Sequence, residues 1–101
     1  MVKHIVVWRL KDSGHGNDRA TNARLIKEKL EALPAQVPGM LKAEVGMDFS
    51  ATPDSGDIVL YSEFASREAL AGYQTHPAHV AAREFIAGAR SERRLIDYET
   101  R

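Results

Sequence analysis

The chain opens with an uninterrupted run of mostly apolar residues that predicts a β-strand. In "VKHIVVWRL", residues 2–10, β-branched and aromatic side chains dominate, and neither glycine nor proline breaks the run. Successive side chains of a strand point to opposite faces, so Ile5 and Val7 share one face. The other face carries five side chains: Val2, His4, Val6, Trp8 and Leu10. Because both faces are apolar, we expect this strand to be covered on both sides.

A helix and a second strand follow. The polar turn "DSGHGND" offers Asn17 and Asp18 as helix caps, and from about 18 to 35 apolar residues occur at steps of three and four. That spacing predicts an amphipathic helix, which the segment "VPGM" then ends. In residues 41–49 the alternating pattern predicts a strand with five side chains on one face: Leu41, Ala43, Val45, Met47 and Phe49.

The second half of the chain predicts a strand, two short helices and a last strand. "DIVLYSEF", residues 57–64, is apolar on both faces, and Ser66 is placed to cap the helix that follows it. The residue before a proline is disfavoured in a helix, so this helix should end near His76. Pro77 suits the first position of the next helix, which runs to about Ala89. "RRLIDYE", residues 93–99, predicts the closing strand.

The resulting order, β-α-β-β-α-β, predicts one α+β domain over residues 1–101. It is the split βαβ, ferredoxin-like arrangement, with a four-stranded antiparallel sheet and helices on one face. Two helical segments cover only that face, yet the first and third strands are apolar on both sides. We therefore expect a second copy to cover the bare face, which gives a two-fold homodimer with its sheets packed together.

Composition narrows the range of partners. Fourteen basic and fourteen acidic residues cancel, which removes the usual electrostatic motive for binding nucleic acid or an anionic membrane. The chain has no cysteine, so disulfides and thiol catalysis are excluded. No run approaches the roughly 20 apolar residues of a membrane span, and no signal segment is recognisable. We expect a soluble, cytoplasmic protein.

Polar side chains that handle protons are predicted to meet at one end of the interior between sheet and helices. These are His4 on the first strand, Asp97 on the last, Tyr73 at the end of the first short helix and His79 in the first turn of the next. The helix dipole and burial both favour a neutral His79, which can accept a proton. Asp97 could fix its tautomer, and the Tyr73 hydroxyl could stabilise an enolate by a hydrogen bond. Such a pair needs no cofactor.

Structural interpretations stand beside this hypothesis. His76 can simply end a helix, His4 can be a satisfied core histidine, and Tyr73 can be ordinary core packing. The spacing H-x-x-H offers only two ligands, so no metal site is predicted. Arg93 lies on the interior-facing side of the last strand, where it could meet an anionic ligand.

Four segments resemble one known family across essentially the whole chain. They are "KHIVVWRLKD", "VPGM…VGMD", "YQTHPAHV" and "LIDY", and they resemble the stress-responsive α/β-barrel (Dabb) domain. The resemblance implies a ferredoxin-like monomer and a dimer whose sheets form a barrel. In one characterised plant relative, olivetolic acid cyclase, a tyrosine and a histidine that match Tyr73 and His79 are the acid and base of a cofactor-free aldol cyclisation. Its first-strand histidine, its other motif histidine and its closing aspartate match His4, His76 and Asp97.

Departures from the plant pattern predict a smaller or more polar cavity. Trp8 replaces an aliphatic residue, and Arg90 and Arg93 stand where the last strand of the plant cyclase begins with apolar residues. Some plant members carry a magnesium ion near the end of the first helix, which the sequence does not test.

Three hypotheses for function follow. In the first, the protein is a cofactor-independent lyase or cyclase in which Tyr73 polarises a carbonyl, His79 moves the proton and Asp97 orients it. The residues that would line this site are His4, Val6, Trp8, His76 and Arg93. In the second, the protein binds a small ligand without turnover. In the third, it is a stress-associated dimer whose polar cluster is structural. A cofactor-free monooxygenase is a less favoured fourth.

Overall fold

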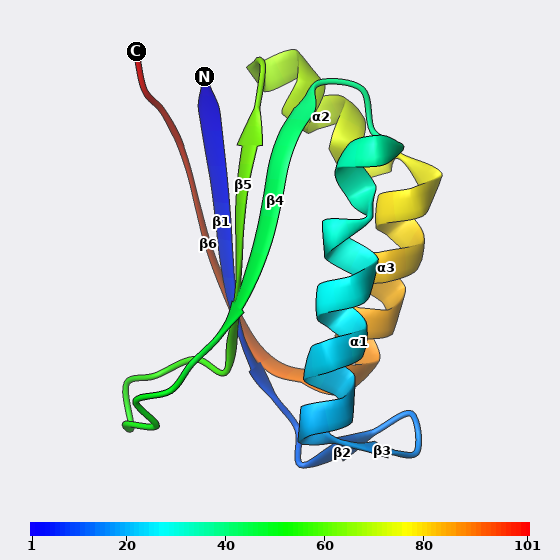
Figure 1. Cartoon of the computed structure of the whole chain (residues 1–101), viewed down its shortest axis with the longest axis vertical. Helices are drawn as coiled ribbons and strands as arrows, with labels where there is room; N and C mark the ends of the chain where they lie inside the picture. Colours follow the sequence, from blue (N-terminus) through cyan, green and yellow to red (C-terminus); the bar gives the residue numbers. More distant parts are fainter.

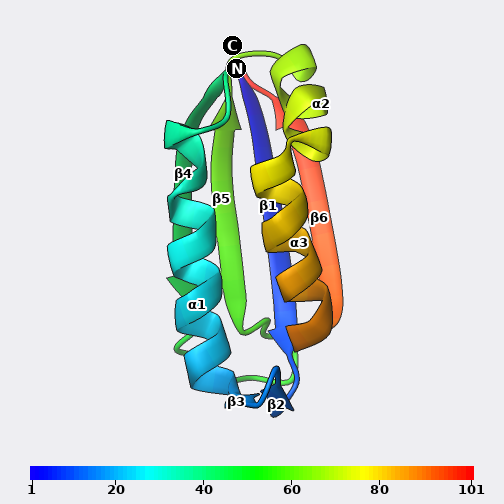
Figure 2. The same cartoon turned by 90° about the vertical axis from the view of Figure 1, so that its right-hand side faces the viewer.

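A computed structural model describes residues 1–101 as one antiparallel sheet with its helices on a single face (Figures 1 and 2). The sheet strands are β1 (Val2–Leu10), β4 (Met40–Met47), β5 (Ile58–Phe64) and β6 (Arg90–Glu99). The helices are α1 (Arg19–Glu31), α2 (Arg67–Thr75) and α3 (Pro77–Ala89). A small hairpin of β2 (Ser13–Gly14) and β3 (Asn17–Asp18) precedes α1, and a 3₁₀ turn, Leu33–Ala35, follows it. The α+β, ferredoxin-like architecture predicted from the sequence is confirmed.

The sheet has the strand order β4-β5-β1-β6, and all its neighbouring strands are antiparallel. β1 is therefore a central strand that pairs with β5 on one side and β6 on the other. In this register His4 lies opposite both Ser62 and Asp97, and Trp8 lies opposite Arg93. Residues far apart in the sequence are thus brought to the same level of the same face.

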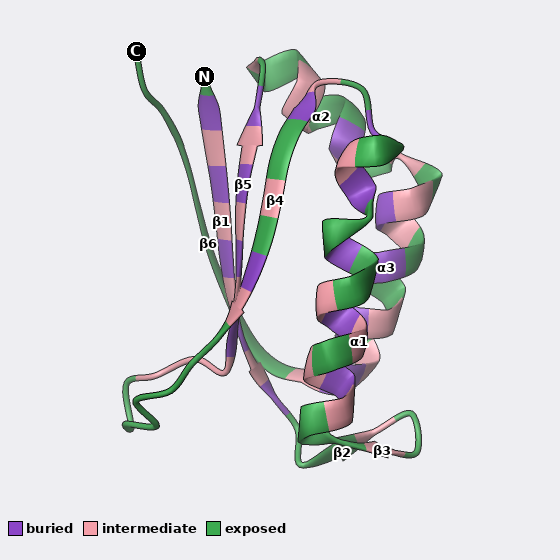
Figure 3. Cartoon of the chain, viewed as in Figure 1, coloured by how far each residue is buried: buried purple, intermediate pink, exposed green.

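Burial alternates strictly along the two central strands (Figure 3). Every second residue of β1, beginning at Val2, is buried beneath the helices, and the residues between them are only partly buried. α1 and α3 supply the opposite side of the core with Ile26, Leu30 and Ile86. The core accordingly lies between one sheet face and the helices, as the alternating pattern predicts.

Capping residues set the helix boundaries. Asp18 accepts a hydrogen bond from the Thr21 amide at the start of α1, and Ser66 accepts one from the Ala69 amide at the start of α2. The predicted helix over about 18–35 is wrong at its end, because α1 stops at Glu31. Pro34 lacks an amide hydrogen and its ring would clash with the carbonyl four residues earlier, so only a tighter turn continues.

The strand predicted over 41–49 is also displaced. β4 begins at Met40 and ends at Met47, and its pairing with β5 shifts register between Met40 and Lys42. This irregularity inserts Leu41 as an extra residue, so it does not share the buried face of Val45 and remains 56% exposed. Phe49 lies beyond the strand and is 99% exposed. β6 starts at Arg90, three residues earlier than predicted.

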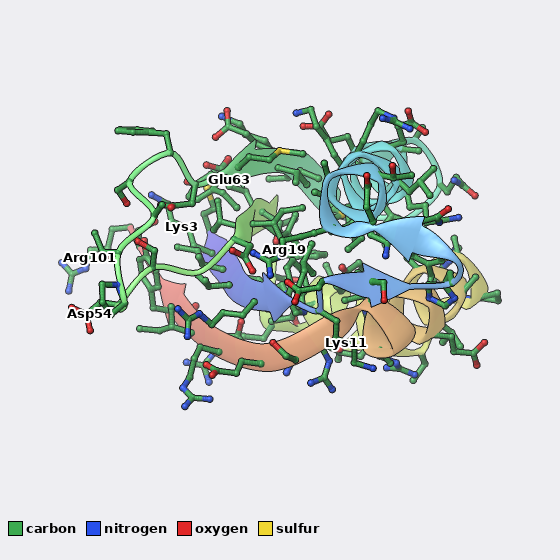
Figure 4. All side chains as sticks on the ribbon, turned by 90° about the horizontal axis from the view of Figure 1, so that it is seen from below. Lys3, Lys11, Arg19, Asp54, Glu63 and Arg101 are labelled. Carbon is green, nitrogen blue, oxygen red and sulfur yellow. The ribbon has the colours of Figure 1, made fainter.

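The second face of the sheet has no helix over it (Figure 1). The segment between β4 and β5 projects away from the sheet on this side, and Asp54 at its tip lies on the side remote from the helices (Figure 4). We call this second sheet face the bare face; its apolar side chains are Ile5, Val7, Val59, Tyr61, Ile96 and Tyr98. No helix has the length and apolar character needed to cross a membrane. The cytoplasmic location stays a prediction.

Gly39 provides a test of how β4 is entered. Its φ is +79°, and a β-carbon placed there would lie 2.5 Å from the Ala69 β-carbon. Gly39→Ala should therefore lower the free energy of unfolding by about 2 kcal/mol or more, since the left-handed conformation alone costs 1–2 kcal/mol. Gly72→Ala is the matched control, because nothing lies within 4 Å of its β-carbon position on α2. It should be neutral or stabilise by up to about 1 kcal/mol. Denaturant unfolding measures the change in the free energy of unfolding for both variants. Equal changes would contradict the left-handed, sterically restricted conformation assigned to Gly39.

Candidate functional site

A cavity of about 280 Å³ lies between the sheet and the α2–α3 pair. It is lined by six residues that the sequence singled out: His4, Val6, Trp8, Tyr73, His79 and Arg93. Leu30, Leu60, Ile86 and Ala87 complete its apolar wall. At this volume the cavity is slightly below the usual size of drug-sized ligand pockets, which suits a small metabolite.

The break between α2 and α3 brings Tyr73 and His79 together. Tyr73 lies in the last turn of α2, and His79 is the third residue of α3. His76 between them is extended, with φ −65° and ψ 133°, as expected before a proline. The chain turns there, and the two rings stack with centroids 3.9 Å apart and planes 27° from parallel. A continuous helix would not align residues six apart in this way.

The environment of His79 favours its neutral form. The side chain is 9% exposed, and its Nδ1 is buried without a hydrogen-bond partner. Burial lowers the pKa of His79, the charges of Arg83 and His4 lower it further, and the backbone carbonyls of Gln74 and Tyr73 oppose the shift. The ring is thus available as a proton acceptor at neutral pH.

Tyr73 has the complementary property. It is 1% exposed, and burial raises the pKa of its phenol, with Arg93 and Arg83 partly opposing the shift. The hydroxyl is therefore protonated throughout the physiological range and acts as a hydrogen-bond donor. A neutral base and a neutral acid stand side by side in one cavity.

The sequence suggested that Asp97 orients His79, but the structure does not bring these two side chains together. The Asp97 carboxylate bonds instead to Nδ1 of His4, because the β1–β6 register places these two residues opposite each other. His4 is 3% exposed and meets the Tyr73 ring edge-on, with centroids 5.9 Å apart. Asp97 itself is outside the cavity lining. It fixes His4, and His4 in turn packs on Tyr73.

His76, predicted to line the site, lies outside the cavity. Its Nδ1 accepts a hydrogen bond from the Ala78 amide at 3.1 Å and so caps α3. The structural interpretation, a histidine that ends one helix and begins the next, describes its position.

Sequence reasoning missed one basic residue of the site, Arg83, and noted Arg90 only as a departure from the plant pattern. Arg83 and Arg90 line the cavity beside Arg93, and Gln74 lies there as well. A signal was present in the helical spacing, because Arg83 lies four residues and Ile86 seven residues beyond His79, on one face of α3. The buried indole nitrogen of Trp8, another lining residue, has no acceptor in the chain. No group of three or more His, Asp or Glu side chains is placed to hold a metal ion.

Known structures share this architecture. A dimeric protein of unknown function from Bacteroides fragilis with a ferredoxin-like fold is 38% identical, with a TM-score of 0.84 and coverage of 98% of this chain and 95% of its own. A protein of Arabidopsis thaliana is 25% identical, with a TM-score of 0.84 and coverage of 100% and 96%. The hydroxynitrile lyase of Passiflora edulis shares the fold at 19% identity, with a TM-score of 0.81 and coverage of 96% and 90%. No curated protein matches significantly.

The family assignment rests on nearly the full length of the chain. The model of the stress responsive A/B barrel domain matches residues 2–100, from the first residue of β1 to just beyond the end of β6. The predicted resemblance is confirmed at this level, and the chain belongs to the stress responsive A/B barrel domain family.

Proposed function

We propose that the protein is a cofactor-independent acid–base catalyst, a lyase or cyclase that acts on a small carbonyl compound. The observation that carries this proposal is the stacked Tyr73–His79 pair in the cavity, with rings 3.9 Å apart. Paired groups whose environments favour opposite proton roles are typical of acid–base sites. The proposed assignment agrees with the resemblance of these two residues to the motif of olivetolic acid cyclase.

In the proposed reaction, His79 removes a proton from the carbon next to a carbonyl group. The C–H electron pair moves into a carbon–carbon double bond, and the carbonyl oxygen becomes an enolate. Tyr73 donates its hydroxyl hydrogen to that oxygen, where a preformed donor is most effective. The enolate carbon then attacks a second carbonyl in a cyclase. In a lyase His79 instead removes the proton of a β-hydroxyl group, and cleavage of the carbon–carbon bond leaves a carbonyl compound and the enolate. The proton held on His79 returns to the product oxygen or carbon.

His4 serves as a positioning residue in this scheme. Its Nδ1 is bonded to Asp97, and its ring packs edge-on against Tyr73 at 5.9 Å. Phe64 packs on Tyr73 as well, with centroids 5.0 Å apart. These contacts from β1 and β5 surround the phenol together with the stacked His79 ring, which limits its rotation and directs its hydroxyl.

A binding module without turnover is the second candidate. It is favoured by the three guanidinium groups at the cavity, which would hold an anionic ligand whether or not it reacts. The hydroxynitrile lyase among the similar structures bears only on the fold, so it does not decide between catalyst and module.

We also propose that two copies pair through the bare face. β1 and β5 present Ile5, Val7, Val59 and Tyr61 there, and Ile96 on β6 is 58% exposed. Four strands of seven to ten residues present roughly 20 × 30 Å, which approaches the roughly 800 Å² per partner of a standard interface. Similar structures from Bacteroides fragilis and Thermobifida fusca are described as dimeric, which supports this pairing.

Substitution of the acid–base pair tests the catalytic proposal. In D₂O the protein should accelerate exchange of the C2 hydrogens of 3-oxobutanoate, followed by ¹H NMR. His79→Ala should lower the catalysed rate by about 10²–10⁴-fold, the usual contribution of a general base. Tyr73→Phe should lower it by about 10²-fold or more, as expected for a lost donor to the enolate. His76→Ala removes only a helix cap, so this variant should catalyse the exchange at close to the wild-type rate. Undiminished exchange in His79→Ala would exclude this mechanism.

The lowered pKa of His79 sets the pH dependence. The neutral ring predominates above its ordinary value of 6.5, so exchange should be independent of His79 protonation there and decline only as the pH falls below that value. Stability should follow the same sign: below pH 6.5 the unfolded chain binds a proton that the folded chain resists, so the free energy of unfolding decreases with falling pH. His79→Gln should remove this part of the slope between pH 7.5 and 5. Parallel stability curves for the two proteins would contradict the assignment.

A single charge on the bare face tests the dimer. Ile96→Asp should shift the wild-type dimer towards monomer in sedimentation velocity at micromolar concentration, because a carboxylate would be desolvated in the interface. Ala71→Asp, an equivalent change at an exposed position of α2, should leave the dimer intact. A wild-type chain that sediments as a monomer throughout this range would refute the pairing.

A further inference from the structure

Three arginines gather at the cavity without acidic partners. Arg83 comes from α3, and Arg90 and Arg93 come from the start of β6. None of them forms an ion pair, whereas the guanidinium groups of Arg9, Arg19 and Arg67 each meet a carboxylate elsewhere on the protein. A chain with no net charge therefore concentrates three positive charges at one cavity. The lining includes no aspartate or glutamate that would balance them.

The surrounding groups do not neutralise this charge. One amino group of Arg83 donates to the Gln74 carbonyl at 3.2 Å, which orients the guanidinium and leaves its charge uncompensated. Asp97 lies on the same face of β6 as Arg93, but four residues further along, and its carboxylate is bonded to His4. A separation of four strand residues is roughly 13 Å. The positive charge is thus free for a ligand.

The wall of the cavity also contains a buried hydrogen-bond donor that has no acceptor in the chain. The Trp8 side chain lines the cavity and is 4% exposed, yet its indole N–H has no acceptor in the chain. Unsatisfied buried donors are rare in native proteins because each costs about 1–3 kcal/mol. In the sheet Trp8 lies directly opposite Arg93, so the indole N–H without an acceptor and the unpaired guanidinium lie at the same level of the sheet.

We infer that Arg83, Arg90 and Arg93 hold the carboxylate of the substrate, and that the substrate class is a small oxo acid. This inference rests on the proposed function for the carbonyl at Tyr73, while the carboxylate site stands on the arginines alone. A guanidinium fork matches a carboxylate through two parallel hydrogen bonds. The cavity volume corresponds to about nine water molecules at roughly 30 Å³ each, which admits a ligand of about ten non-hydrogen atoms.

The same placement fixes which end of the ligand reacts. Arg83 and Arg93 line the same cavity as Tyr73, which places their charges near the proposed enolate oxygen. With its carboxylate on these side chains, an oxo acid presents its carbonyl to Tyr73 and the carbon between the two groups to His79. A neutral ketone of equal size would lack this anchor and bind in no preferred direction.

Binding of 3-oxobutanoate and of its neutral methyl ester to the full-length protein tests this inference. By saturation-transfer NMR and calorimetry, wild-type protein should bind the acid at least tenfold more tightly than the ester. Arg93→Gln and the double variant Arg83→Gln/Arg93→Gln should each weaken binding of the acid by about tenfold or more and leave binding of the ester unchanged. Arg93→Lys keeps the positive charge but loses the two parallel hydrogen bonds, so its affinity for the acid should lie between those of the wild-type protein and Arg93→Gln. Arg24→Gln, on the exposed side of α1, is the control and should bind as wild type.

The outcomes separate this inference from the proposed function. Acid binding that depends on the arginines, without any C2 exchange, would support the carboxylate site and count against the catalyst. Exchange that proceeds equally on acid and ester, and is unaffected in Arg83→Gln/Arg93→Gln, would support the catalyst and overturn the carboxylate site. Inorganic phosphate that binds where 3-oxobutanoate does not would also overturn it. Equal affinity of the wild-type protein for acid and ester would do the same.

Discussion

In the antiparallel pairing of β1 with β6, His4 lies opposite Asp97 and Trp8 lies opposite Arg93. This register is the constraint on which the rest of the site depends, because the side-chain period of a strand is two. A slip of one residue would turn His4 and Trp8 to the bare face and replace them beneath the helices with Ile5 and Val7. The alternation of large apolar residues along β1 opposes such a slip, since it would also expose Val6 and Leu10. The core and the site are specified by one pattern.

A second constraint acts from the helical side. Pro77 forces the chain out of the helical conformation at His76, and the two helices that result meet at an angle which one continuous helix could not produce. Tyr73 and His79 are consequently stacked across the break, each anchored in its own helix. Both rings are buried, so packing holds the pair in place without a direct hydrogen bond. Preorganisation of this kind is what an acid–base site requires.

The parts of this arrangement that the sequence predicted are those set by local patterns. The alternation in β1 and β5, the caps at Asp18 and Ser66 and the break at Pro77 are readable because each depends on a few neighbouring residues. The hydrogen bond between Asp97 and His4 was not readable, since it depends on a register fixed by pairing across more than ninety residues. The extra residue at Leu41 was hidden for the same reason: a bulge appears only against its partner strand.

Arg83 was missed, and Arg90 was noted only as a departure from the plant pattern, for a different physical reason. Arg83 and Arg90 carry no local signature, because a long flexible side chain on an exposed position normally belongs to a solvated surface. Their significance comes from where α3 ends and β6 begins, which places both beside Arg93 at one cavity. Helical spacing from His79 could have suggested Arg83, but only a structure shows that this face of α3 borders open space.

A structural role alone does not account for the energetic costs of the polar cluster. A histidine retained for stability would satisfy both ring nitrogens, as the bond of His4 to Asp97 begins to do. His79 instead has an unpartnered Nδ1 and a lowered pKa, so its burial opposes folding at acid pH. The orphan N–H of Trp8 adds a further cost. Costs of this kind persist in proteins chiefly where function requires them, and here they converge with three unpaired positive charges on one cavity.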